Sequence, residues 1–562
     1  MKYSKYSLIV TFFLLFPLQS KAASLEYSYL IRGDAPNNGI TIRYGSLENK
    51  SYYSCSFDTL VCTNVGSTAP TAATPTADTS DTAVVTNPFD VLDGVKRVSY
   101  KGVSPDGKFV YYYQYSTAND PNSHFVLYDT KTGGTSKTTD NVHYWDLLTE
   151  ENRLFSVASD SKTLVYLDNR EGSNALYKVD LAHPKTKMMI GTRITKLSYS
   201  VSDFIFLDPN TILFMANRES PQQWNLYRYN LKTSAVTKIA SNTSYADAMI
   251  KVGSNVVFLQ IKGNAVIPVV YNYTTKTISE FSITQTAGIT AVNNPYQLVK
   301  YGSVNGVLLK PTSSTGSHPL IIWLHGGPYR DISPTIHPYL SYGVYDWDLE
   351  EARRNGAVVL KIDYHGSYGQ GRTFAESLKG QAGVLDVADV ITSLKGVKKT
   401  LGTKYKISGV YLVGNSYGGY LALKAITDYP NSFAGAYSIN GVTDWPTLIT
   451  KLKTSIFNVY FNGLPTLANS KLYAQAEIVD NINSLTTQKI MLVQAQSDTD
   501  VSPAQADFLF NNLNSKGKNV QIIKIEDEDH VFKKNSSITQ ICSTLLTFIG
   551  LTSNDPNRCQ YQ

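Results

Sequence analysis

The chain has 562 residues, of which 42% are hydrophobic and 17% charged, and its formal net charge is +6. One hydrophobic core rarely grows beyond about 250–300 residues, so we expect a soluble protein of two domains. A positive charge this small, spread over this length without a run of basic residues, excludes a strongly basic nucleic-acid-binding protein, and we predict no nucleic-acid partner.

Residues 1–22 have the pattern of a signal peptide. Lys2 and Lys5 precede an apolar run at 8–18, and the triplet at 20–22 resembles a small-x-small cleavage site. A membrane-spanning helix needs about 20 apolar residues, so an uncleaved membrane anchor is the less favoured alternative. We therefore predict an exported protein, periplasmic or secreted, with no integral membrane span once the signal peptide is removed.

The four cysteines lie in two local pairs, Cys55 with Cys62 and Cys542 with Cys559. In an oxidising compartment the simplest of the three possible connectivities is a disulfide within each pair. A zinc site is the alternative, but the spacings match no zinc pattern and no histidines cluster with the thiols. The sequence predicts neither a bound metal nor a cofactor.

Residues 23–295 are predicted to form an all-β, propeller-like domain. Residues 66–88, rich in Thr, Ala and Pro, are interpreted as a low-complexity loop within it. Beyond this loop a plan of turn, strand, loop, strand and polar turn recurs about every 50 residues, as the blades of a propeller require. There is room for five or six blades, and a β-sandwich with similar hairpins is the alternative. The copies begin at Ser104, Ser159 and Asp208, with a degenerate one near Gly253.

Residues 296–562 are predicted to form an α/β domain. Short apolar strands alternate with helical segments, which implies a mostly parallel, doubly wound sheet. The strands are expected at 320–324, 357–362, 410–413, 433–439, 490–493 and 520–525, and the clearest helices at 384–400 and from 421 onward.

The predicted strand at 410–413 runs directly into Gly414-Asn415-Ser416-Tyr417-Gly418, and a helix follows. This is the G-x-S-x-G nucleophile turn, in which small neighbours allow a tight bend and leave the serine exposed at a helix N-terminus. Free backbone N–H groups and the helix dipole favour developing negative charge at that place. We therefore predict Ser416 as the nucleophile of an α/β-hydrolase, the alternative being an ordinary glycine-rich turn.

A serine nucleophile needs a base, and the base needs an orienting carboxylate; in this fold their chain order is Ser, Asp or Glu, then His. His530 is the one histidine that follows Ser416, and it lies just after the predicted strand at 520–525. The loop after the strand at 490–493 offers two candidate acids, Asp498 and Asp500.

An acyl-transfer site also needs two donors for the oxyanion that forms on the substrate carbonyl. The N–H of Tyr417, next to the nucleophile, is the first candidate. The second is the N–H of Gly327 in His325-Gly326-Gly327-Pro328, where glycines allow the backbone to approach the substrate.

With these motifs the chain resembles the prolyl oligopeptidase family of serine peptidases over most of 295–550. The resemblance selects Asp498 as the acid, in a D-x-x-V pattern ending at Val501, and gives a triad of Ser416, Asp498 and His530. It also implies an apolar slot for the substrate, and a substrate-facing position at Asp500. The matching segments are 323–328, 363–371, 414–419 and 441–445, with Asp386 in the helix beyond the second of them, and the slot residues are Tyr417, Trp445 and Val501.

The chain departs from the family's motifs at several positions beside the triad. Gln494-Ala495 replaces the His-Gly before the acid, His365 replaces the Arg of R-G-S, and Asp529 replaces the Gly before the histidine. Asp500 stands where relatives often carry Asn or Arg. These changes leave the triad whole and bear on subsite specificity.

The resemblance implies an exported serine peptidase that hydrolyses short peptides through an acyl-enzyme, with the propeller screening out folded chains. Two alternatives stay open. The same site would suit an esterase or another acyl hydrolase, since esters are cleaved more readily than amides. A catalytically decayed protein that binds peptides is the alternative outside the enzymes.

Overall fold

The computed structural model describes residues 26–34, 39–45, 50–67, 98–115, 122–137, 142–143, 155–182, 191–245, 248–263, 265–283, 296–338, 340–452, 456–551 and 559. The predicted signal peptide, most of the predicted loop at 66–88 and the predicted domain boundary near 295 lie outside these residues. Within the described part of the chain, no helix is long and apolar enough to cross a bilayer.

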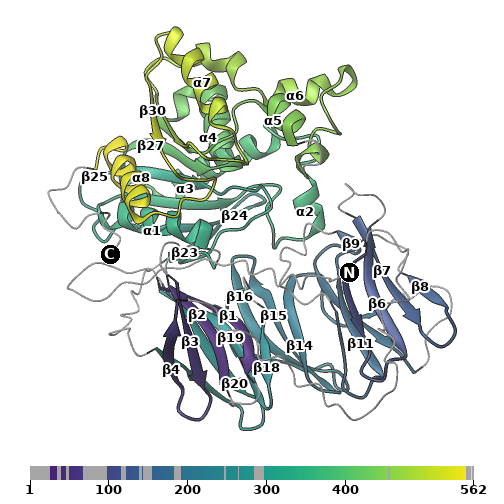
Figure 1. The fold of residues 1–562 in the computed structure, drawn as a ribbon. Helices are drawn as coiled ribbons and strands as arrows, with labels where there is room; N and C mark the ends of the chain where they lie inside the picture. The colour runs from purple at the N-terminus through teal and green to yellow at the C-terminus, as the bar shows by residue number, and fades with distance from the viewer. Residues whose placement is uncertain are drawn as a thin grey trace.

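The carboxyl-terminal α/β domain is built on a sheet in the order β23-β24-β26-β25-β27-β28-β29-β30 (Figure 1). From β26 to β30 along this order, neighbouring strands are parallel, whereas β23 and β24 pair antiparallel at one edge. Strand order reverses at β25, between β26 and β27, and such switch points leave a crevice at the carboxyl ends of the strands. The strands are β23 Tyr296–Tyr301, β24 Val304–Leu309, β25 Ser317–Leu324, β26 Val358–Asp363, β27 Lys406–Asn415, β28 Gly435–Ile439, β29 Lys489–Ala495 and β30 Val520–Ile525.

Helices cover both faces of this sheet, because alternate residues of its buried strands point to opposite sides. Leu320 and Ile322 of β25 pack in one core cluster with α3, α4 and α7, while Ile321 and Trp323 pack in another with α1 and α8. The doubly wound fold class is confirmed. The helices are α1 Leu340–Arg354, α2 Arg372–Glu376, α3 Leu385–Leu401, α4 Tyr417–Asp428, α5 Trp445–Leu452, α6 Ser470–Ala476, α7 Pro503–Ser515 and α8 Asn535–Phe548.

The all-β domain lies beneath the α/β domain in Figure 1 as sets of antiparallel strands placed side by side. Each predicted copy of the repeat is a hairpin at the centre of a set: β6–β7, β11–β12, β15–β16 and β19–β20. The first set, β1–β4, was not among the predicted copies. The strands are β1 Glu26–Asp34, β2 Gly39–Gly45, β3 Lys50–Ser56, β4 Val61–Gly66, β5 Val98–Val103, β6 Phe109–Tyr115, β7 Asn122–Asp129, β8 Thr135–Lys137, β9 Val142–His143, β10 Phe155–Val157, β11 Thr163–Asp168, β12 Ala175–Asp180, β13 Thr192–Arg193, β14 Val201–Asp208, β15 Thr211–Ser220, β16 Gln223–Asn230, β17 Val236–Ala240, β18 Ile250–Val252, β19 Asn255–Lys262, β20 Ala265–Asn272, β21 Thr277–Glu280 and β22 Ser282–Ile283.

Strands from the two ends of the all-β domain join its first and last sets. Glu26 of β1 pairs in parallel with Ala265 of β20, and Ser282 of β22 pairs in parallel with Val61 of β4. The first set is therefore completed by residues far along the chain.

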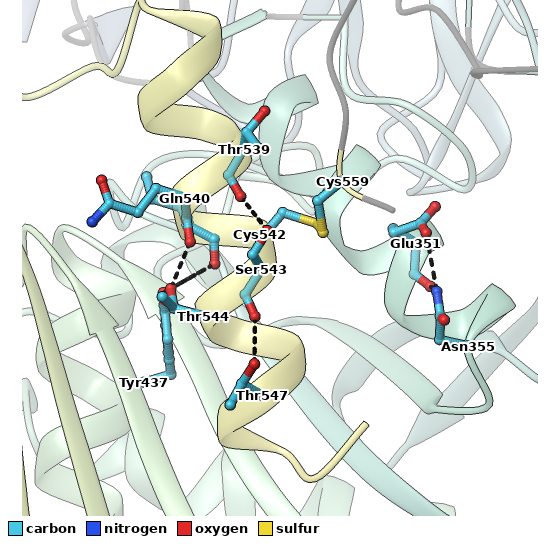
Figure 2. Close-up of a disulfide and its surroundings, with 11 residues drawn as sticks. Glu351, Asn355, Tyr437, Thr539, Gln540, Cys542, Ser543, Thr544, Thr547 and Cys559 are labelled. Atoms are coloured by element: carbon cyan, nitrogen blue, oxygen red, sulfur yellow. Dashed lines mark hydrogen bonds between the residues drawn. A yellow bond between two sulfur atoms is a disulfide. The ribbon is translucent and has the colours of Figure 1, made fainter. Parts of the chain in front are cut away.

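Both predicted disulfides, Cys55–Cys62 and Cys542–Cys559, are present. Cys55 and Cys62 face each other across β3 and β4. Figure 2 shows the second disulfide, which ties Cys542 in the middle of α8 to Cys559; Glu351 of α1 and Asn355, directly after α1, are among its surroundings. Cys542 and Cys559 are both fully buried, in the core cluster to which α1 and α8 contribute.

Removing the second disulfide is expected to destabilise the α/β domain. The bond closes a loop with a sequence separation of 17 residues, and the chain-entropy model gives such a closure about 3 kcal/mol of stability. In the double variant Cys542→Ala, Cys559→Ala, we expect the thermal midpoint of unfolding to fall by roughly 5–10 °C. The midpoint is measured by monitoring thermal unfolding with far-UV circular dichroism. An unchanged midpoint would contradict the prediction.

Candidate active site

Ser416 lies at the turn between β27 and α4, with backbone angles of φ 53° and ψ −118°. Non-glycine residues rarely adopt a positive φ, so the surrounding structure holds this turn in a strained conformation. A Cβ atom at Gly418 would lie 1.9 Å from the carbonyl oxygen of Leu324 at the end of β25, so only glycine allows this approach. The serine is partly exposed at the switch point of the sheet, as predicted from the G-x-S-x-G motif.

The three residues of the predicted triad are brought together from three strand ends. His530 Nε2 lies 3.0 Å from Ser416 Oγ, and His530 Nδ1 lies 2.8 Å from Asp498 Oδ2. The other oxygen of Asp498 accepts the backbone N–H groups of Asp500 and Val501, at 2.9 and 2.8 Å. Of the two candidate acids, Asp498 is therefore the one whose carboxylate contacts the imidazole, and the D-x-x-V turn fixes its orientation.

The environment of His530 favours its protonated form. Burial acts to lower its pKa, but the hydrogen bond to Asp498 and the negative charges of Asp498, Asp500 and Asp529 outweigh burial, so the pKa of His530 is raised above its usual value. An imidazole with a raised pKa is a stronger base towards a hydroxyl proton, provided that it is neutral at the working pH.

Asn440, directly after β28, joins the loops that carry the acid and the histidine. Its side chain, 1% exposed, accepts the N–H of Ala495 at 2.8 Å and donates to the carbonyl oxygen of His530 at 3.0 Å. Asn440 could not be singled out from the sequence, because a lone Asn at a strand end carries no motif. Its position beside the Gly441–Trp445 segment was the available signal.

Acidic residues around His530 also shape its loop. Asp529, where the family has Gly, accepts the N–H groups of His530 at 2.7 Å and Thr499 at 3.3 Å. Buried Glu528 accepts the N–H groups of Lys533 and Lys534, at 2.9 and 2.8 Å, just before α8. The histidine loop is therefore held at both ends by carboxylates, and Glu528 was not singled out from the sequence.

The segments that carry the predicted oxyanion donors both lie beside the nucleophile. Tyr417 is the first residue of α4, where backbone N–H groups have no acceptor within the helix. The loop with Gly327 follows β25, and a Cβ on Gly326 would lie 3.2 Å from Ser416 Cβ, so this loop passes directly beside the nucleophile. Tyr364 donates its hydroxyl to the carbonyl oxygen of His325 at 2.6 Å, which fixes the start of the loop.

The residues predicted to line the apolar slot lie together but are closed to solvent. Tyr417, Trp445 and Val501 are 1%, 1% and 3% exposed, and the rings of Tyr417 and Trp445 pack with centroids 5.6 Å apart. A substrate side chain can enter between them only if some of them shift. The slot therefore stays a prediction, whereas Asp500 is exposed beside the acid loop.

Beneath this cluster the Tyr417 hydroxyl donates to Asp386 Oδ2 at 2.7 Å. Burial is the main cause that raises the pKa of Asp386 to about 7, and hydrogen bonds from Tyr417 and Val387 oppose the rise. His365, which replaces the family's Arg, lies with Nδ1 2.7 Å from Asp389 Oδ2. The segment after β26 is therefore anchored to α3 through an imidazole in place of a guanidinium.

Among the described residues, no three His, Cys, Asp or Glu side chains are grouped so that they could hold a metal.

Residues 344–555 match the prolyl oligopeptidase family, and residues 119–268 match the dipeptidyl peptidase IV N-terminal region. Acylamino-acid-releasing enzyme 1 from Oryza sativa subsp. japonica is 36% identical over 117 residues, which make up 21% of this chain and 14% of that enzyme. Dipeptidyl aminopeptidase BIII from Pseudoxanthomonas mexicana is 23% identical over 223 residues, 38% of this chain and 30% of that enzyme. The matched stretches thus span less than a third of these relatives' own lengths.

Among solved structures, a puromycin-hydrolyzing peptidase of Mycobacterium tuberculosis superimposes with a TM-score of 0.66. The superposition covers 95% of this chain and 79% of that chain at 16% sequence identity, which shows a shared fold. The α/β domain is thus similar to the prolyl oligopeptidase family of serine peptidases, and the all-β domain is similar to the N-terminal region of dipeptidyl peptidase IV.

Proposed function

We propose that this protein is a serine peptidase that cleaves short peptides by acyl transfer at Ser416. The observation that carries the proposal is the hydrogen-bonded series from Ser416 Oγ through His530 to Asp498, at 3.0 and 2.8 Å. A nucleophile, its base and an orienting acid in series are the minimum equipment for this chemistry. The match of residues 344–555 to the prolyl oligopeptidase family supports the same reaction.

In the first half-reaction Ser416 Oγ attacks the substrate carbonyl while His530 Nε2 takes the hydroxyl proton. Asp498 holds the imidazole in the required tautomer and stabilises the imidazolium. The N–H groups of Tyr417 and Gly327 donate to the oxyanion. His530 then gives its proton to the leaving amine as the peptide bond breaks. In the second half-reaction water replaces the amine, and His530 returns the proton to Ser416 as the acid product leaves.

Short peptides are the proposed substrates. The all-β domain lies against the α/β domain through buried contacts such as that of Asn217 with Gly369, and we infer that it limits access to the nucleophile. The matched relatives are named for releasing acylamino acids and for dipeptidyl aminopeptidase activity. These names favour cleavage close to the N-terminus of the substrate.

The direct test is labelling of the wild-type chain with a fluorophosphonate, followed by mass-spectrometric mapping of the modified residue and cleavage of a peptide library. We expect the label on Ser416 and loss of peptide cleavage in proportion to labelling. Turnover of esters without any peptide cleavage would make the protein an esterase. Absence of both labelling and turnover would leave a peptide-binding protein and overturn the proposal.

The pH dependence of the reaction should reflect the raised pKa of His530. Since the base must be neutral, kcat/KM is lost as pH falls through this pKa, and we expect the midpoint of the acid limb above the usual value of about 6.5 for histidine. Asp500→Asn removes one of the negative charges that raise this pKa, so its limb should move to lower pH. A wild-type midpoint below that of free histidine would contradict the assignment.

We also propose that Asp500 favours substrates with a positive group near the second residue. Its side chain is exposed beside the acid loop, which supports a role at the rim of the site. We expect wild-type kcat/KM to be about 3–10 times higher for a Lys-containing peptide than for its Glu-containing counterpart, as a surface charge pair allows. Asp500→Asn should remove most of this preference. If the variant keeps the wild-type preference for the Lys-containing peptide, the proposed role of Asp500 is wrong.

Export is part of the proposal and is supported by the signal-like pattern at 1–22 together with two buried disulfides. Sequencing the N-terminus of the mature protein is the test. A chain that begins near Ala22 or Ala23 supports cleavage, and a chain retaining Lys2 contradicts it.

A further inference from the structure

The two domains meet at a seam of buried polar contacts near β15 and β16. Asn217 donates to the carbonyl oxygen of Gly369 at 2.6 Å, and Gln222 donates to Asp363 Oδ2 at 3.3 Å. The side chains of Asn217 and Gln222 are each 3% exposed. Hydrogen bonds at such depth fix the relative position of the groups they join, because breaking them would leave buried polar atoms unpaired.

Asp331 is the centre of this seam. The carboxylate, 2% exposed, accepts Trp224 Nε1–H at 3.2 Å and the hydroxyl of Tyr245, and His337 Nε2 lies 3.3 Å from it. Trp224 and Tyr245 belong to the all-β domain, whereas Asp331 and His337 belong to the α/β domain. A buried carboxylate is therefore stabilised largely by donors from the other domain.

Asp331 lies four positions beyond Gly327, on the same loop as this predicted oxyanion donor. A neighbouring loop supports that segment from a second side, since the N–H of Tyr368 donates to the carbonyl oxygen of Arg330 at 3.0 Å. The ring of Trp224 stacks on Tyr368, with centroids 5.5 Å apart and planes at 10°. Trp224 thus contacts both loops at once, through its N–H and through its ring.

The close approach of the domains is built into the chain at Gly369. A Cβ atom there would lie 3.1 Å from Asn217 Nδ2 and 3.6 Å from the Trp224 ring. Gly369 also has a φ of 82°, a backbone conformation that residues with a side chain rarely adopt. The absence of a side chain at Gly369 therefore allows Asn217 of β15 and Trp224 of β16 to pack closely against the loop that contains Gly369.

We propose that Trp224 and Tyr245 of the all-β domain are positioning residues for the oxyanion loop, acting through Asp331. This rests on the proposed function of the site. Oxyanion donors stabilise a transition state only when they are held at hydrogen-bonding distance from the position that the negative oxygen will occupy. Misplacement of a catalytic group by about 1 Å can cost roughly 100-fold in rate, so a smaller displacement costs less.

The test compares two tyrosine-to-phenylalanine variants of the full chain. Tyr245→Phe removes the hydroxyl that binds Asp331. Tyr113→Phe is the matched control, since its buried hydroxyl donates to the carbonyl oxygen of Leu167 inside the all-β domain, at 2.8 Å. Trp224→Phe is the second test variant, because it keeps a ring against Tyr368 but loses the N–H donor, and it serves if Tyr245→Phe does not fold.

For each protein we would measure kcat, KM, the thermal midpoint and the affinity of two ligands. One is a peptide boronic acid, whose adduct with Ser416 places an oxygen in the oxyanion site, and the other is the matching peptide product. We expect Tyr245→Phe and Trp224→Phe to lower kcat and boronic-acid affinity by about tenfold, with KM and product affinity within about twofold of wild type. Tyr113→Phe should match wild type in all four kinetic and binding values.

The inference is overturned if the two seam variants behave like Tyr113→Phe, or if they change KM and product affinity while kcat stays at the wild-type value. Either result would leave the proposed function intact, because wild-type turnover and labelling of Ser416 are measured independently. Absence of wild-type turnover would overturn the proposed function itself.

Discussion

Ser416→Ala is expected to lower kcat for peptide hydrolysis by roughly 10⁴- to 10⁶-fold, the range seen when a triad nucleophile is removed. The substitution deletes the attacking atom and leaves both oxyanion donors in place, so KM should change little. The decrease is measured by progress curves with a peptide substrate, and fluorophosphonate labelling should disappear in parallel.

The matched control is Ser393→Ala on α3, where a fully buried hydroxyl has no hydrogen-bond partner among the described residues. This variant should keep wild-type kcat and labelling, because the hydroxyl that it removes makes no hydrogen bond to the described residues of the site. Residual peptide hydrolysis by Ser416→Ala above about 1% of wild type would show that another group is the nucleophile.

Asp498→Asn is expected to lower kcat by roughly 10³- to 10⁴-fold with little change in stability. One side-chain oxygen of Asp498 accepts two backbone N–H groups, from Asp500 and Val501. An asparagine would keep its oxygen there and turn its NH₂ towards His530 Nδ1. The imidazole would then carry its proton on Nε2, facing Ser416, and could not accept the hydroxyl proton.

Asp507→Asn on α7 is the control for this substitution, since its exposed carboxylate pairs with Lys524 at 2.7 Å. Exposed pairs contribute about 0–1 kcal/mol, so this variant should keep wild-type kinetics and a nearly unchanged thermal midpoint. Full activity in Asp498→Asn would mean that the observed hydrogen bond to His530 does not orient the base.

The meeting of Ser416, Asp498 and His530 could be predicted because each of them follows a strand that the sequence marks clearly. Ser416 carries a motif, and His530 and Asp498 come directly after apolar runs whose carboxyl ends meet at the same edge of a parallel sheet. Asn440 and Asp331 could not be predicted in this way. Their roles depend on which distant backbone or side-chain groups reach them, and no local pattern carries that information.

The fold was predictable to a similar degree and for similar reasons. Continuous apolar runs gave the buried strands of the α/β sheet, and recurring turns gave the central hairpins of the all-β sets. The first set, β1–β4, was not predicted because two of its strands pair with strands far along the chain. The slot at Trp445 shows another limit, because a motif indicates which rings lie near the nucleophile but not whether they are packed shut.

The pairing of β1 with β20 and of β22 with β4 has a consequence for synthesis of the chain. During elongation, Glu26 leaves the ribosome long before its partner Ala265 exists, and Val61 long before Ser282. Contacts of such high sequence separation form slowly, because a long loop must close before they stabilise anything. Strands β1 and β4 are therefore synthesised early but are among the last strands of the all-β domain to be fully paired. Until β20 and β22 have been synthesised, the N-terminal strands lack these partners.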